Sequence, residues 1–326
     1  MTVLVTGAAG FIGYHVANAL LDRGIAVLGI DSLNADYNTA LKEARLARLR
    51  NCSNFRFLHA DLSDQSVLDG PLRDLAIQDI VHLAARAGVL QSIARPFDYL
   101  HSNVTGHLTI LEFARRQKNF RHLVYASSAA LYGASAAVPF AETADVNRPV
   151  SLYAATKGAD ELLSYNYAYM FGLPQTGLRF FTVYGPWGRP DMALWMFASA
   201  ILENKPIRIF NYGAMTRDLT FVDDIVQGVL AALDRPPRAE QGAAPHRIYN
   251  IGKGRAENLM AIVDVLENSL GKKAIRQLEP MPLGDVAHSC ADVSSIQREL
   301  GYQPSTPIET GIPRFVEWFL DYHRQS

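Results

Sequence analysis

A glycine-rich turn near the start of the chain constrains the fold more than any other feature. Thr6-Gly7-Ala8-Ala9-Gly10-Phe11-Ile12-Gly13 directly follows a β-branched run and directly precedes a helical pattern that extends from Tyr14 to Arg23. Glycines at this spacing allow a tight turn, close approach of the backbone to a pyrophosphate, and close packing of the helix on the strand. The helix N-terminus also attracts the anion. The turn therefore predicts a doubly wound parallel sheet that binds a dinucleotide.

The first 180 residues alternate short β-branched runs with helical patterns, which is typical of a parallel sheet covered on both faces. We expect an α/β fold with a Rossmann-type sheet in residues 1–180 and later chain returns at roughly 215–250. Prolines break the chain into shorter pieces after this region. We therefore expect a smaller, mainly substrate-binding lobe in residues 181–326. The expected strands are Val3–Thr6, Ala26–Ile30, Phe55–His59, Ile80–Leu83, Leu123–Ala126 and Gln175–Phe180.

Composition narrows the class of protein further. The 326 residues include 31 basic and 32 acidic side chains, a balance that points to neither nucleic acid nor a membrane surface. Cys52 and Cys290 lie far apart, which argues against a disulfide framework or a metal site. The sequence has no apolar run of membrane-spanning length, and no charged leader precedes Thr2. We expect a cytoplasmic protein without a metal.

Asp31 ends the second expected strand, where a carboxylate can accept hydrogen bonds from an adenosine ribose. Ser32 follows it instead of an arginine, which favours NAD over NADP because the acid would repel a 2′-phosphate. Asp61 and Leu62 follow the third strand and can address the adenine edge, but Asp61 can equally cap the next helix. His82 lies inside an apolar strand, and we expect it to be structural.

Tyr153 and Lys157 open a helical stretch and lie four residues apart, so they share one helix face. A neighbouring ammonium favours the phenolate, which can then act as a general base. Many surface helices contain this pair by chance, so it gains weight only beside other motifs. Ser127 and Ser128 end the fifth strand, where hydroxyls can project into the crevice in which open parallel sheets bind ligands.

The glycine turn, the serine pair before Leu131-Tyr132-Gly133, and the Tyr-Lys pair occur in an order and spacing that resemble the extended short-chain dehydrogenase/reductase family. The resemblance implies that Ser128 hydrogen-bonds the reacting sugar hydroxyl and that Tyr153 is the base. It implies that Lys157 assists the tyrosine and binds the nicotinamide ribose. It also implies a homodimer built on helices near 97–117 and 153–171, although packing within one chain explains the same apolar stripes.

Residues 30–34, 178–193 and 211–218 are similar to stretches typical of UDP-glucuronate 4-epimerases within that family. This resemblance implies C4 interconversion of UDP-glucuronate and UDP-galacturonate with NAD through a transient 4-keto sugar, in the service of polysaccharide biosynthesis. Ala129 and Ala130 stand where related dehydratases and UDP-glucuronate decarboxylases carry acids. UDP-glucose/UDP-galactose 4-epimerase is the alternative, and a UDP-glucuronate decarboxylase or a non-catalytic NAD-binding sensor or scaffold are further ones.

The carboxylate of UDP-glucuronate needs hydrogen-bond donors that do not promote decarboxylation of the 4-keto intermediate. We expect hydroxyl and backbone donors from Ser127, Ser128 and Thr182 there, with Arg86 and Arg189 as cationic candidates. Either arginine can instead pair with a surface acid.

The resemblance places Arg217 at the diphosphate, and Phe210 or Tyr212 beside the uracil. An ion pair with Asp218 or Asp223 is the alternative role of Arg217. Asn103 is either an ordinary polar helix residue or a holder of the catalytic helix, and we assign Asp285 no catalytic part. The expected cofactor-binding residues are Gly7, Gly10, Phe11, Ile12, Gly13, Asp31, Asp61, Leu62, Leu83, Ala84, Ala85, Asn103, Tyr153 and Lys157.

Overall fold

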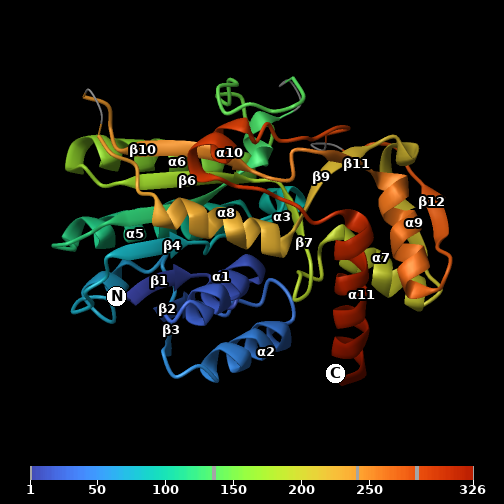
Figure 1. Cartoon of the computed structure of the whole chain (residues 1–326), viewed down its shortest axis with the longest axis horizontal. Coiled ribbons are helices and arrows are strands. Elements are labelled where there is room, and N and C mark those ends of the chain that lie inside the picture. Colours follow the sequence, from blue (N-terminus) through green and yellow to red (C-terminus); the bar gives the residue numbers. More distant parts are fainter. Residues whose placement is uncertain (1, 134–136, 240–241, 283–285, 326) are drawn as a thin grey trace.

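A computed structural model describes residues 2–133, 137–239, 242–282 and 286–325, so Asp285 lies outside the described residues. Its centre is a seven-stranded parallel sheet in the order β10-β6-β5-β4-β1-β2-β3, which confirms the α/β, Rossmann-type prediction (Figure 1). The strands are β1 (Thr2–Thr6), β2 (Ala26–Asp31), β3 (Phe55–His59), β4 (Asp79–His82), β5 (His122–Ser128), β6 (Gln175–Phe180) and β10 (His246–Ile251).

Two apolar clusters fill the two faces of this sheet because successive side chains of a strand point to opposite faces. Val3 and Val5 of β1 belong to one cluster, and Leu4 belongs to the other. Helices α1 (Phe11–Asp22), α2 (Thr39–Arg50) and α8 (Val222–Asp234) contribute to the first cluster, and α5 (Gly106–Arg116) contributes to the second. The central strands are therefore buried on both faces, as their β-branched runs predict.

Short elements form a second group at the right of Figure 1. A three-stranded sheet runs in the order β11-β9-β7, and β12 pairs with β8. Trp195 of α7 packs against Trp318 and Phe319 of α11, which closes the apolar side of this group. The bounds are β7 (Thr182–Tyr184), α7 (Ala193–Leu202), β8 (Pro206–Ile209), β9 (Thr216–Phe221), β11 (Ala256–Asn258), α9 (Leu259–Leu270), β12 (Ile275–Leu278) and α11 (Ile308–Gln325). Helix α10 (Ser294–Leu300) instead packs against β10 and α8 of the first group.

The helix expected over 97–117 is not regular. The structure has the short α3 (Val89–Ala94) and α4 (Pro96–Tyr99), then a π-helical segment over Leu100–Thr105, and only then α5. π-Helical turns inside helices are rare and frequently lie at functional sites. Among the described helices, none combines the length and apolar character needed to cross a bilayer.

Helix α6 (Leu152–Phe171) carries the Tyr-Lys pair, and its ends follow from local sequence. Ser151 caps it, with Oγ accepting a hydrogen bond from the Ala154 backbone N–H at 3.1 Å. Gly172 ends it in the left-handed conformation at φ +65°. The cap fixes Tyr153 in the first turn of the helix, one residue inside its start.

Candidate active site

One cavity of about 610 Å³ opens at the carboxyl ends of the central strands, where β1 and β4 lead their connections in opposite directions. Open α/β sheets bind ligands at this switch point. Asn103, Phe210 and Tyr212 are not among the lining residues, but the other expected site residues are. These are Gly7, Gly10, Phe11, Ile12, Gly13, Asp31, Asp61, Leu62, Leu83, Ala84, Ala85, Arg86, Ser127, Ser128, Tyr153, Lys157, Thr182, Arg189 and Arg217.

The glycine turn forms the floor of one end of the cavity. A Cβ on Gly7 would lie 2.9 Å from the Ala84 backbone nitrogen, and a Cβ on Gly13 would lie 2.0 Å from the Gly7 carbonyl oxygen. Gly10 precedes α1 and adds no side-chain cap to it. The close backbone approach and the open helix N-terminus fit a dinucleotide pyrophosphate.

Asp31 is fixed in place at the end of β2. Its Oδ2 accepts a hydrogen bond from the Ala9 N–H at 3.1 Å, and its Oδ1 accepts one from the Leu33 N–H at 2.8 Å. The ammonium of Lys42 lies 4.0 Å from Oδ1 and donates to the side-chain oxygen of Asn34 at 2.7 Å. This arrangement presents an oriented carboxylate to the cavity, as binding of the adenosine ribose of NAD requires.

Asp61 bonds locally to Ser63 and does not have the helix-capping role that the sequence left open. Its Oδ1 accepts hydrogen bonds from the backbone N–H of Ser63 at 2.9 Å and from the Ser63 hydroxyl at 2.8 Å. Asp64, and not Asp61, caps the following short helix, through Ser66. His82 is buried and bonds Thr6 Oγ1 through Nδ1 at 2.7 Å, so it is a structural residue, as expected.

Lys157 is buried and has a partner that sequence reasoning missed. Its Nζ donates to Asp160 Oδ2 at 2.9 Å, and both side chains are almost inaccessible to solvent. Burial raises the pKa of Asp160 to about 6, although the adjacent ammonium opposes this shift. The i,i+3 spacing on α6 was a visible signal of this pair. Tyr153, one turn earlier, packs edge-on against Tyr99 with 6.2 Å between ring centroids.

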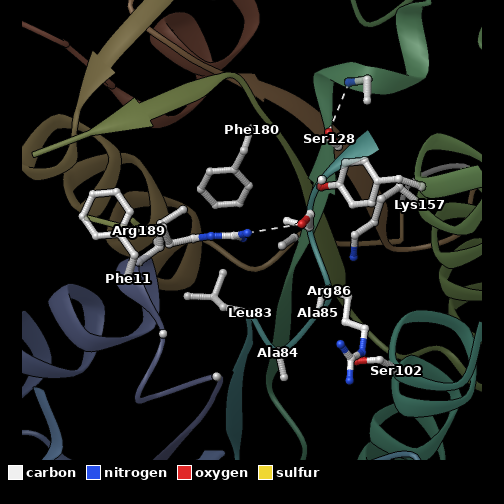
Figure 2. A pocket seen from close by; sticks show the side chains of 18 of the residues that line it. Phe11, Leu83, Ala84, Ala85, Arg86, Ser102, Ser128, Lys157, Phe180 and Arg189 are labelled. Carbon is white, nitrogen blue, oxygen red and sulfur yellow. Dashed lines mark hydrogen bonds between the residues drawn. The ribbon is translucent and has the colours of Figure 1, made fainter. Parts of the chain in front are cut away.

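The serine pair divides between two environments. Ser128 Oγ accepts a hydrogen bond from the Ala130 N–H at 3.1 Å, and Figure 2 shows Ser128 on the same side of the cavity as Lys157. Ser127 Oγ instead donates to Glu161 Oε1 at 2.5 Å, and Glu161 pairs with Arg179 at 2.8 Å. Ser127 lines the cavity but its hydroxyl is bonded to Glu161, so its expected contact with the substrate stays a prediction.

Asn103 lies behind the cavity wall, on the π-helical segment. Its Oδ1 accepts from the Arg86 N–H at 2.7 Å, and its Nδ2 donates to the Arg86 carbonyl at 3.1 Å and to Thr156 Oγ1 at 2.9 Å. Thr156 in turn donates to the Tyr153 carbonyl at 2.8 Å. Asn103 thus ties the loop after β4 to the first turn of α6, which is the second of the two roles left open for it.

The cavity's arginines differ in direction. In Figure 2, Arg189 extends from the side of Phe11 toward the middle of the cavity, whereas the Arg86 side chain points away from Ser128. Arg189 Nη2 donates to the Ala87 carbonyl at 3.2 Å, and its guanidinium also pairs with Asp191 at 2.5 Å. Arg86 pairs with Asp36, which is the ion-pair alternative. Both arginines thus have an acidic partner, and the expected contact of either with a ligand carboxylate stays a prediction.

Arg217 lies on β9 and lines the same cavity. Its Nη1 donates to the carbonyls of Thr216 and Ala287, both at 3.1 Å. Phe210 and Tyr212 lie on the short helical turn Phe210–Gly213. Tyr212 is 65% exposed and the Phe210 ring lies under the Arg208 guanidinium at 5.1 Å, so their role beside uracil stays a prediction.

Comparisons with known proteins show which family this chain resembles. Residues 3–252 match the model of the NAD dependent epimerase/dehydratase family. UDP-glucuronate 4-epimerase 2 of Arabidopsis thaliana is 44% identical over 336 residues, which cover 100% of this chain and 77% of that protein. The UDP-glucuronic acid 4-epimerase of Bacillus cereus, solved with UDP-glucuronic acid and NAD, is 31% identical with a TM-score of 0.88, covering 99% of this chain and 100% of that one.

A UDP-glucose 4-epimerase of Thermotoga maritima, solved with UDP-glucose, has the same TM-score of 0.88 at 27% identity, covering 99% of this chain and 100% of that one. Backbone similarity therefore does not distinguish the two sugar classes. Of the relatives named here, the UDP-glucuronate 4-epimerase 2 of Arabidopsis thaliana has the highest sequence identity to this chain.

Proposed function

The chain belongs to the NAD dependent epimerase/dehydratase family, and from this premise we propose that it interconverts UDP-glucuronate and UDP-galacturonate by inversion at C4. The proposal rests on one observation: the same cavity is lined by the glycine turn, by Ser128, Tyr153 and Lys157, and by Arg189. Full-length similarity to UDP-glucuronate 4-epimerases at 44% identity supports the same substrate. The enzyme is an NAD-dependent nucleotide-sugar epimerase.

Cofactor binding follows from the two ends of the cavity. The glycine turn and the α1 N-terminus would hold the pyrophosphate, Asp31 the adenosine ribose, and Lys157 the nicotinamide ribose. A nicotinamide held there would supply a hydride acceptor and donor for C4, so that inversion would pass through a 4-keto sugar without net redox change. The small Ala84 and Ala85 side chains leave the flat cofactor room against the backbone.

Tyr153 carries the proton transfer. As phenolate it removes the proton of the C4 hydroxyl, and as phenol it returns that proton to the oxygen after the sugar has presented its other face. The buried ammonium of Lys157, held by Asp160, lies one helical turn after Tyr153 on α6. Ser128 at the end of β5 supplies the hydroxyl that orients the reacting oxygen.

The active site must bind the carboxylate of the substrate without allowing decarboxylation. With glucuronate the 4-keto intermediate is a β-keto acid, which loses carbon dioxide when its carboxylate stands perpendicular to the carbonyl. Arg189 can clamp that carboxylate through two N–H donors, and Thr182 can add a hydroxyl. Ala129 and Ala130 line the cavity without an acidic proton, which fits epimerisation better than decarboxylation.

Exposed apolar side chains support the expected homodimer. Leu162 and Tyr169 of α6 are 73% and 65% exposed, and Phe97 of α4 is 72% exposed. Large apolar patches on a soluble protein usually mark an interface. We infer that these helices meet their counterparts in a second copy. A cytoplasmic location, where UDP-sugars are substrates, is part of the same proposal.

The proposal is tested by incubating purified protein with UDP-glucuronate, without added reductant, and following the anomeric proton signals by NMR. UDP-galacturonate is expected, with UDP-glucose unreacted in a parallel tube. The Tyr153→Phe variant is expected to lose about 10²- to 10⁴-fold in rate, because it lacks the proton-transferring group. Formation of a UDP-pentose, or reaction of UDP-glucose alone, would overturn the assignment.

A further inference from the structure

The loop between β7 and α7 carries Arg189 into the cavity, and a buried cation from another part of the chain holds it there. Arg45 of α2 is 0% exposed and does not line the cavity. Its Nη1 donates to the Ala9 carbonyl of the glycine turn at 2.9 Å. Its Nη2 donates to the carbonyls of Trp187 at 2.6 Å and Gly188 at 3.1 Å. One guanidinium thus joins the cofactor-binding turn to the substrate loop.

The guanidinium of Arg45 is stabilised by hydrogen bonds to neutral acceptors. Nε donates again to the Trp187 carbonyl at 3.2 Å, and Nη1 donates to the Tyr37 hydroxyl at 2.7 Å. Among the described residues, no carboxylate forms an ion pair with this guanidinium. A buried charge without a counter-ion is tolerated only where hydrogen bonds satisfy it, so the positions of these carbonyls are tightly constrained.

The loop itself needs such a constraint. Trp187 adopts φ +61°, a conformation that is unfavourable for a residue other than glycine and persists only where the surroundings enforce it. His15 of α1 supplies a second anchor through Nε2, which lies 2.9 Å from the Pro186 carbonyl. Burial lowers the pKa of His15 to about 4, so the ring is neutral at neutral pH and donates from a protonated Nε2.

We propose that Arg45 is a positioning residue for recognition of the sugar carboxylate: by tying the carbonyls of Trp187 and Gly188 to the glycine turn, it sets Arg189 relative to the bound cofactor. The inference rests on the proposed function, in which Arg189 meets the carboxylate of UDP-glucuronate. Arg45 contacts neither ligand and acts only through the loop.

The first test compares two ligands on NAD-loaded protein by isothermal titration calorimetry. Arg45→Lys keeps the charge but cannot span the three carbonyls, so Arg189 is expected to shift. Displacement of a clamp by about 1 Å can cost up to about 10²-fold, and we expect UDP-glucuronate to bind about tenfold more weakly. UDP, which lacks the sugar acid, should change by less than about twofold. Arg50→Lys makes the same exchange at an exposed position of α2 and should change neither affinity.

The second test is a double-mutant cycle with Arg189→Ala. If Arg45 acts through Arg189, Arg45→Lys should cause no further loss of UDP-glucuronate affinity in the Arg189→Ala background. Equal weakening of UDP and UDP-glucuronate, or losses that multiply in the double variant, would overturn the positioning role. The epimerase assay on wild-type protein decides the proposed function separately, since it does not depend on Arg45.

If Arg45→Lys does not fold, His15→Phe provides the second variant. A phenyl ring keeps the edge contacts with Phe11 and Tyr14 but removes the bond to the Pro186 carbonyl. A selective loss for UDP-glucuronate over UDP, smaller than that of Arg189→Ala, is expected. An unselective loss of both ligands would count against an anchored loop.

Discussion

Replacement of Gly13 by alanine should abolish cofactor retention through a steric effect that the structure quantifies. The added Cβ would lie 2.0 Å from the Gly7 carbonyl oxygen, whereas ordinary contact begins at 3.4 Å. One of the two backbone segments must therefore move by more than about 1 Å. Overpacking of this kind typically costs about 1–3 kcal/mol. Because only backbone can yield here, we expect the upper end, and with about 1.4 kcal/mol per factor of ten, about a 100-fold loss of NAD affinity.

The assay is NAD titration followed by fluorescence, alongside thermal unfolding. Gly106→Ala is the matched control, because it is also a helical glycine and its Cβ would lie at an ordinary 3.6 Å from Leu62 Cβ. That control should leave NAD affinity unchanged and raise stability by about 0.5–1 kcal/mol through helix propensity. Unchanged NAD affinity in Gly13→Ala would refute the assignment of the turn as the pyrophosphate site.

Three further predictions concern other parts of the site. Asn103→Ala should lower stability by about 2–4 kcal/mol and reduce kcat, since it leaves the Arg86 N–H and carbonyl without their side-chain partner and removes the donor to Thr156 Oγ1. Urea unfolding measures the stability and initial rates measure kcat. Asp160 has a folded pKa of about 6, above its unfolded value of 3.8, so its contribution to stability falls as pH rises between about 4 and 6. Asp160→Asn should therefore remove on the order of 2–3 kcal/mol of pH dependence from the free energy of unfolding in that range. The measurement is the difference between the wild-type and variant free energies of unfolding as a function of pH. Leu162→Glu should shift a dimer toward monomers in size-exclusion chromatography with light scattering, and an unchanged mass would exclude α6 from the interface.

The elements that sequence could place are those with strong local signals. β3 and β6 begin and end at the expected residues, β1 and β2 differ by one residue at one end, and β4 is shifted by one residue, because β-branched runs bounded by turns specify strands locally. β10 was missed as a strand of the central sheet. Its sequence, His246–Ile251, does not alternate polar and apolar residues, and it joins the sheet only by pairing with β6, about 70 residues earlier. Such an edge strand is decided by tertiary context.

The site also combines residues that local sequence signals predict with contacts that depend on the tertiary structure. The positions of Tyr153, Lys157 and the glycines follow from motifs whose spacing fixes their geometry. The contact between Arg45 and Trp187 joins residues 142 apart, and no local pattern signals it. The long-range hydrogen bonds that shape the substrate loop therefore required the structure.

The most direct test of the central claim is to follow UDP-glucuronate deuterated at C4 through the reaction in ordinary water. If the enzyme inverts C4 by removing and returning the same hydride, UDP-galacturonate will retain the deuterium at C4, as measured by NMR and mass spectrometry. Loss of the label to solvent would mean that C4 is deprotonated as an acid, and would contradict the roles assigned to Tyr153 and the cofactor.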